Sequence, residues 1–231
     1  MASESKHTAY ASDFEVDSRD LHLQAKVRAL RLVDNIRIGV TSVALLMGVT
    51  ILGLSANTLS VYSDTHVGSD FFLPLWPDQF DLQPTIALVV GSTVVFLANT
   101  VSLVSSKVHH FRNMTAVHTS LGLATPLLGL AAAAVAMASF YLANASDRAD
   151  TLLSWTCRWQ SVAMSQPPHW CPLCRESRAA VYLAVLLVPV EAVVLAVAAH
   201  QVTVERGISA YARARNSPSP TPLVAGMQAK A

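Results

Sequence analysis

The chain alternates between long apolar stretches and shorter polar ones. Four stretches are apolar on every helical face, and each is longer than the roughly 20 residues needed to cross a hydrocarbon core. Three of them contain no charged residue, and the fourth contains only Glu191. Lipid offers no hydrogen-bond partners to a backbone, so each stretch must form a helix. We therefore predict four membrane spans, which cover residues 38–61, 85–106, 120–143 and 179–204.

The composition indicates the same class of protein. Hydrophobic residues make up 52% of the chain, charged residues 13%, and the mean hydropathy is +0.42, whereas about 25% of the residues of a soluble domain are charged. The connection between the second and third spans, residues 107–119, is short, which favours one compact antiparallel bundle. The predicted fold is all-α, a transmembrane four-helix bundle formed by residues 21–206.

The segments that flank the spans are polar. Residues 1–20 and 207–231 have the composition of disordered tails. Between the first tail and the first span, apolar residues recur at helical spacing and basic residues fall on other faces, which predicts a juxtamembrane amphipathic helix on the lipid surface. In the second tail, three hydroxyl residues each precede a proline and would be substrates for proline-directed kinases. These residues are Ser217, Ser219 and Thr221.

Charge sets the orientation across the membrane. Residues 1–37, residues 205–231 and the connection between the second and third spans hold twelve Lys and Arg residues, and the other two connections hold four. Basic residues stay on the cytosolic side, so both termini are expected to be cytosolic and the first span to act as an uncleaved insertion signal. The outer connections contain all of the tryptophans, which we expect to anchor the chain at the lipid headgroups. They are Trp76, Trp155, Trp159 and Trp170.

The cysteines Cys157, Cys171 and Cys174 are close together in the second outer connection. An oxidising compartment favours a structural disulfide, for which Cys157 with Cys174 is the preferred pair and Cys171 an alternative partner. Cys171 and Cys174 also form a Cys-X-X-Cys pair of the kind found in thiol oxidoreductases, although a relay between two cysteine pairs needs a fourth cysteine. The weakest interpretation is a zinc site that adds His169 to the three sulfurs.

Glu191 is the one acidic residue within the predicted spans. A carboxyl group surrounded by lipid or packed helices is expected to be neutral and to make a hydrogen bond to a neighbouring helix. Asn99 of the second span lies at a similar depth and its amide both donates and accepts, so it is the preferred partner. We interpret the pair as a structural contact between helices, and the alternative is a proton or ion relay.

Several small residues within the spans stand four positions apart. This spacing lets helix backbones approach closely, either inside the bundle or against another membrane protein or a second copy. The pairs are Ala87 and Gly91, Gly129 and Ala133, Ala132 and Ala136, and Ala192 and Ala196.

Five segments resemble MARVEL-like four-span membrane proteins of filamentous fungi. They are "LRLVDNIRIGVTSVALLMGVTILGLSA", "LPLWPDQFDLQPT", "SLVSSKVHHFR", "LLSWTCRWQ" and "LVPVEAVVLAVAAHQ". The resemblance extends over most of residues 24–206. It implies an M-shaped topology with both ends cytosolic, and roles in membrane apposition, vesicle cargo or lateral domain organisation. Cys171 departs from the two-cysteine loop of such proteins.

The sequence therefore favours a non-enzymatic integral membrane protein without a cofactor, which organises membrane lipids or protein neighbours in the plasma membrane or an endomembrane. Its net charge of +1 gives no basic field for nucleic acid. Two alternatives use particular residues. One is a thiol-disulfide oxidoreductase at the outer face with Cys171 and Cys174, and the other is a small transporter with Glu191 as its proton-linked site.

Overall fold

The computed structural model describes residues 6–66, 75–77, 80–107, 115–145 and 149–216. Four long helices and one short helix account for most of these residues, and two short strands pair in parallel. The helices are α1 (Lys6–Thr65), α2 (Gln83–Lys107), α4 (Thr115–Asn144), α5 (Leu152–Arg158) and α6 (Trp170–Asn216). The strands are β1 (Phe80–Asp81) and β2 (Asp150–Thr151).

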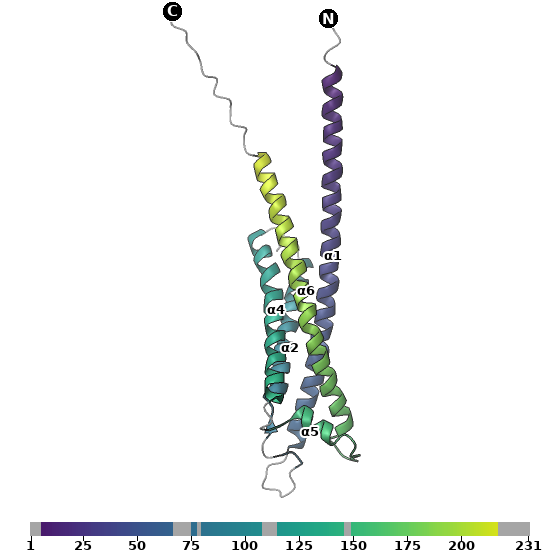
Figure 1. Cartoon of the computed structure of the whole chain (residues 1–231), viewed down its shortest axis with the longest axis vertical. Helices are drawn as coiled ribbons and strands as arrows, with labels where there is room; N and C mark the ends of the chain where they lie inside the picture. The colour runs from purple at the N-terminus through teal and green to yellow at the C-terminus, as the bar shows by residue number, and fades with distance from the viewer. Residues whose placement is uncertain (1–5, 67–74, 78–79, 108–114, 146–148, 217–231) are drawn as a thin grey trace, which may run out of the picture.

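The four long helices form an antiparallel bundle. Helix α1 packs against α2 and α6, and α4 packs against the same two helices, so the four surround one core. The N-terminal end of α1 and the C-terminal end of α6 leave the bundle at the same end (Figure 1). Each long helix contains one of the predicted spans and is long and apolar enough to cross a membrane. The predicted fold class is confirmed, and the chain is an integral membrane protein.

The core has the spacing of a left-handed coiled coil. On each long helix a series of buried positions alternates between steps of four and three residues, which keeps one seam facing the bundle axis. The seam of α1 consists of Arg37, Thr41, Ala44, Gly48, Ile51, Ser55 and Thr58. The seam of α2 consists of Thr85, Leu88, Ser92, Val95, Asn99 and Ser102.

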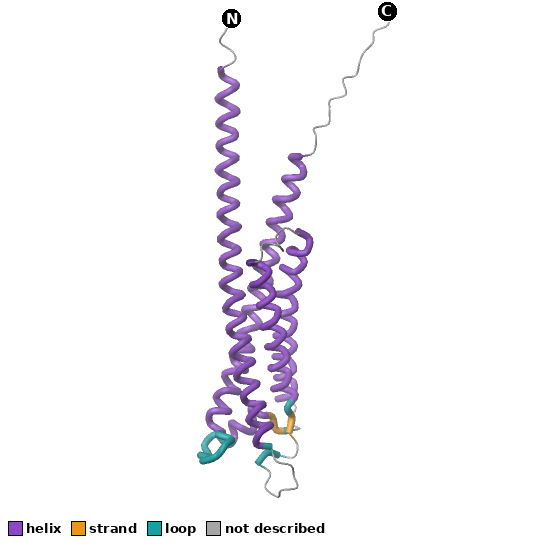
Figure 2. Tube along the Cα trace, turned by 180° about the vertical axis from the view of Figure 1, so that it is seen from behind, coloured by secondary structure: helices purple, strands orange, loops and turns teal. Residues whose placement is uncertain are grey.

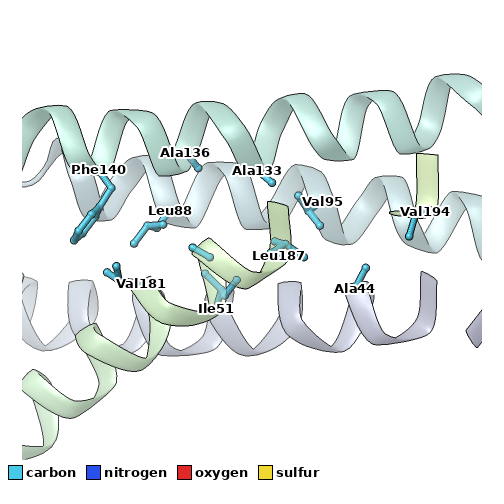
Figure 3. Packing of buried hydrophobic residues seen from close by; sticks show 11 residues of the cluster. Ala44, Ile51, Leu88, Val95, Ala133, Ala136, Phe140, Val181, Leu187 and Val194 are labelled. Atoms are coloured by element: carbon cyan, nitrogen blue, oxygen red, sulfur yellow. The ribbon is translucent and has the colours of Figure 1, made fainter. Parts of the chain in front are cut away.

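The seams of α4 and α6 are richer in small residues, so these helices come close to their neighbours. The seam of α4 consists of Gly122, Pro126, Gly129, Ala133, Ala136 and Phe140. The seam of α6 consists of Ala180, Ala184, Leu187, Glu191, Val194 and Ala198. Figure 3 shows the apolar part of this core, where Ala44 faces Val194 and Ile51 lies near Leu187.

Two helices extend further than the sequence predicted. Helix α1 begins at Lys6 and continues straight into the first span, whereas residues 1–20 were expected to be disordered and residues 21–37 to form a helix on the lipid surface. Residues 1–38 contain no glycine or proline, so no residue in this part interrupts the helix. Helix α6 likewise continues past residue 207 and ends at Asn216, two residues before Pro218.

A small cap closes the bundle at the end opposite the chain termini (Figure 2). The pairing of β1 with β2 joins the connection before α2 to the connection after α4. Helix α5 starts with a capping box, in which the Thr151 hydroxyl accepts from the Ser154 N–H and the Ser154 hydroxyl accepts from the Thr151 N–H. Asp150 also pairs with Arg158 at 3.0 Å, which fixes the two ends of this helix.

Candidate functional site

Glu191 lies in the centre of the bundle and is fully buried. Its Oε1 accepts a hydrogen bond of 2.7 Å from the Nδ2 of Asn99, which is also buried. The structure therefore brings together the two residues that the sequence analysis paired. Because both are seam positions, the bond connects α6 to α2 through the core.

Gly129 of α4 makes the space that the Glu191 carboxyl occupies. A methyl group at Gly129 would lie 2.8 Å from Oε2 of Glu191 and 3.3 Å from Oε1. Oε2 is buried and has no hydrogen-bond partner among the residues that the structure describes. The glycine therefore lets α4 pack directly over a carboxyl group that would otherwise require a wider core.

A second polar layer lies nearer the end from which α1 and α6 project. Arg37 is 7% exposed, and its guanidinium donates to the Oε1 of Gln201 at 3.0 Å and to the hydroxyl of Ser102 at 3.4 Å. Gln201 in turn donates to Glu205 at 3.2 Å. Gly122 of α4 faces the same guanidinium, because a methyl group there would lie 4.0 Å from both of its terminal nitrogens.

Arg37 is a core residue that the sequence analysis missed. The charge count included it among the basic residues that precede the first span, where a lysine or arginine is expected to face water or lipid headgroups. The sequence does contain a pattern that indicates burial of Arg37, because this residue stands four residues before Thr41 and seven before Ala44 on the same helical seam.

The other half of the core, towards the cap, combines apolar side chains with buried hydroxyl groups, which belong to Ser55, Thr58, Thr85 and Ser92. A cavity of about 10 Å³, close to the smallest volume that holds one water molecule, lies next to the Glu191 layer. Ser92 also lines this cavity, but its hydroxyl donates to the carbonyl of Leu88 on its own helix at 2.6 Å. The remaining lining consists of Ile51, Leu88, Gly91, Val95, Ala133, Ala136, Ala184 and Leu187.

In the cap, a disulfide joins Cys157 of α5 to Cys174 of α6. Cys171 is a free and exposed thiol one helical turn before Cys174. The structure thus contains the preferred pair and not the Cys171–Cys174 pair on which the oxidoreductase interpretation depends. The disulfide also uses two of the three cysteine sulfurs that the proposed zinc site requires. The fourth proposed ligand, His169, is exposed.

The tryptophans divide into two groups, and one differs from the expectation. Trp76 and Trp170 are buried in the cap and lie edge to face at 5.1 Å, with Tyr62 and Phe80 against Trp76. The expectation that they anchor the chain at lipid headgroups is therefore wrong for this pair, because the two outer connections fold against each other and supply an apolar interior. Trp159 is 42% exposed, as an interfacial residue would be.

The small-residue pairs also divide into two groups. Gly129 and Ala133 are both buried inside the bundle, and Gly91 and Ala136 meet between α2 and α4. Ala192 and Ala196 are both exposed on the outer surface of α6. Ser217, Ser219 and Thr221 lie outside the described residues.

No protein-family model, curated protein or solved structure matches the chain.

Proposed function

We propose that this protein is a non-enzymatic organiser of its membrane, which holds lipids or protein neighbours against the outer surface of its helices. The resemblance to MARVEL-like proteins supports this role, as does the expected cytosolic position of both termini. The observation that carries the proposal is the direction in which the side chains of the spans point. Glu191, Asn99 and Arg37 point inward and bond to other helices, whereas large apolar side chains cover the outside of all four spans.

Inward polar groups stabilise the packing of the bundle and leave an apolar outer surface for contact within the membrane plane. On that surface Ala192 and Ala196 offer a place where a second helix backbone can approach α6 closely. Large apolar side chains are also exposed on α6, among them Leu186 and Val193. The face of α6 is therefore the preferred contact for a protein neighbour or a second copy.

The test is proximity labelling in cells with the labelling enzyme fused to the N-terminal end. Replacing Ala192 and Ala196 with leucine should remove a defined set of neighbours, because the added side chains block a close helix approach. The matched control replaces Val101 and Val104 with leucine, since both are exposed on α2 and neither belongs to a small-residue pair. The proposal is wrong if the α6 double variant, folded and correctly inserted, keeps the same neighbours as the wild-type chain.

A further inference from the structure

Two cavities of about 10 Å³ each lie between the Glu191 layer and the cap, and their linings differ. The cavity next to Glu191 has Ser92 as the one polar side chain of its lining. The other cavity, which lies nearer the cap and which we call the polar cavity, is lined by four residues with hydroxyl groups. They are Ser55, Thr58, Thr85 and Ser177.

The hydroxyl residues of the polar cavity come from three helices that are distant in the sequence. Ser55 and Thr58 stand three positions apart on the α1 seam, Thr85 lies near the start of α2, and Ser177 lies two turns into α6. Apolar side chains, among them one from α4 and one from α5, form the rest of the lining. All five helices therefore meet around this cavity.

One hydroxyl of the polar cavity lacks a hydrogen-bond partner. Ser55 is 3% exposed, and its Oγ is unpaired within the described part of the chain. A buried hydroxyl of this kind destabilises the fold unless another group or an ordered water satisfies it. Thr58 donates to the carbonyl of Leu54 at 2.8 Å, so its oxygen can still accept from a further donor.

A single water molecule fits these requirements. An internal water needs roughly 10–15 Å³ of space and two to four polar partners. The polar cavity offers about 10 Å³ and the hydroxyls of four residues. The cavity next to Glu191 has the same volume, but its one hydroxyl, that of Ser92, already donates to the carbonyl of Leu88 at 2.6 Å. A water molecule there would have too few partners.

We propose that the polar cavity binds one water molecule, which is the hydrogen-bond partner of Ser55 and connects α1 to α2 and α6 beneath the cap. The water both donates and accepts, so it can satisfy the Ser55 hydroxyl and donate to the Thr58 oxygen at the same time. This site goes beyond the organising role, because it depends only on the interior of the bundle.

The first experiment is a crystal structure of the full-length chain in a lipid phase, at a resolution that shows ordered water. We expect a density peak at about 2.5–3.0 Å from the Oγ of Ser55 and from at least one hydroxyl of α2 or α6. The cavity next to Glu191 is the internal control, in which we expect no such peak.

An empty polar cavity overturns the proposal, as does a Ser55 hydroxyl that donates to a carbonyl of its own helix instead. Density of equal strength in both cavities also overturns it, because the hydroxyl partners would then not decide where water binds.

The second experiment compares the thermal unfolding of Ser55→Ala and Ser92→Ala in detergent. Both changes remove the hydroxyl of a buried serine that lines a cavity of the same volume. The Ser92 hydroxyl is bonded to its own helix, so its variant measures the loss of such a bond. We expect Ser55→Ala to lower the unfolding temperature by more than Ser92→Ala does, because it removes a partner of the bound water.

The other outcomes contradict the proposal in distinguishable ways. If the Ser55 hydroxyl has no partner at all, its removal leaves the unfolding temperature unchanged or raises it. If this hydroxyl bonds to its own helix, the two variants lower the unfolding temperature equally. The crystal structure uses the wild-type chain, so it tests the site even if one of the variants fails to fold.

Discussion

At the scale of single residues, the contact of Glu191 with Asn99 is the most informative. Both side chains are buried, so removing one of them leaves the other without its partner in a medium that supplies none. The two residues should therefore act as a unit, in which the effect of a change at one depends on the identity of the other.

We expect Glu191→Ala to lower the free energy of unfolding by about 2–4 kcal/mol, because it creates a cavity and leaves the Asn99 amide unpaired. Glu191→Gln retains the shape and a hydrogen-bonding oxygen and should cost about 1 kcal/mol or less. Thermal unfolding in detergent measures both variants. Equal destabilisation by Ala and Gln would contradict the assignment of Glu191 as a packed contact between helices.

Gly129 should be coupled to Glu191 in the same way. Gly129→Ala places a methyl group 2.8 Å from Oε2, so we expect it to cost about 1–3 kcal/mol by overpacking. In a Glu191→Ala background the same change should be nearly neutral or stabilising, because the methyl group then enters the space that the carboxyl left. A double-mutant cycle measures this coupling, and additive effects would show that the two residues do not share one space.

Gly91 offers a test of packing alone. Gly91→Ala places a methyl group 2.5 Å from the Cβ of Ala136 and 3.2 Å from the carbonyl oxygen of Ala132, so α2 and α4 must separate. We expect a loss of about 1–3 kcal/mol of unfolding free energy. Gly53→Ala is the matched control, since no atom lies within 4 Å of its new methyl group and alanine favours helix. A larger loss for Gly53→Ala than for Gly91→Ala would contradict this packing.

At the scale of elements, the four spans were predictable because an apolar window of about 20 residues has one physical solution in lipid. The register between the helices could not be predicted from the sequence. That Gly129 opposes Glu191, and that Gly122 opposes Arg37, depends on how α4 slides along α6 and α1, and this is set by packing between residues far apart in the sequence. The sequence shows small residues on α4 but not which side chain they accommodate.

The cap shows a similar limit. Trp76 and Trp170 are distant in the sequence, and each on its own has the properties of an interfacial anchor. Only the pairing of β1 with β2 and the docking of α5 on α6 bring the two rings together. A rule based on residue type and loop position therefore misplaced the buried pair.

The disulfide should be the main covalent support of this cap. It closes a loop between residues 17 positions apart, and a loop of about this length contributes roughly 3 kcal/mol by limiting the unfolded chain. We expect Cys157→Ser with Cys174→Ser to lower the unfolding temperature and to expose the cap to protease, with Cys171→Ser as the control that leaves both unchanged. If the double variant and Cys171→Ser behave alike, the disulfide does not stabilise the cap.

At the scale of the whole molecule, both helices that project from the bundle do so at one end and the disulfide-bonded cap lies at the other (Figure 1). The charge count predicts that the projecting ends lie in the cytosol and the cap lies outside. Cys171 makes this orientation measurable, because it is the free and exposed thiol of the cap.

We expect a membrane-impermeant maleimide to label the wild-type chain in intact cells if it resides at the cell surface, or in vesicles sealed with their lumenal face outward if it resides in an internal membrane. Cys171→Ser should abolish this labelling, since the other two cysteines are held in the disulfide. A cysteine introduced at Ser3 in the Cys171→Ser background should react only after the membrane is permeabilised. The reverse pattern would place the cap in the reducing cytosol, where a structural disulfide does not persist, and it would contradict both the orientation and the role of the disulfide in the cap.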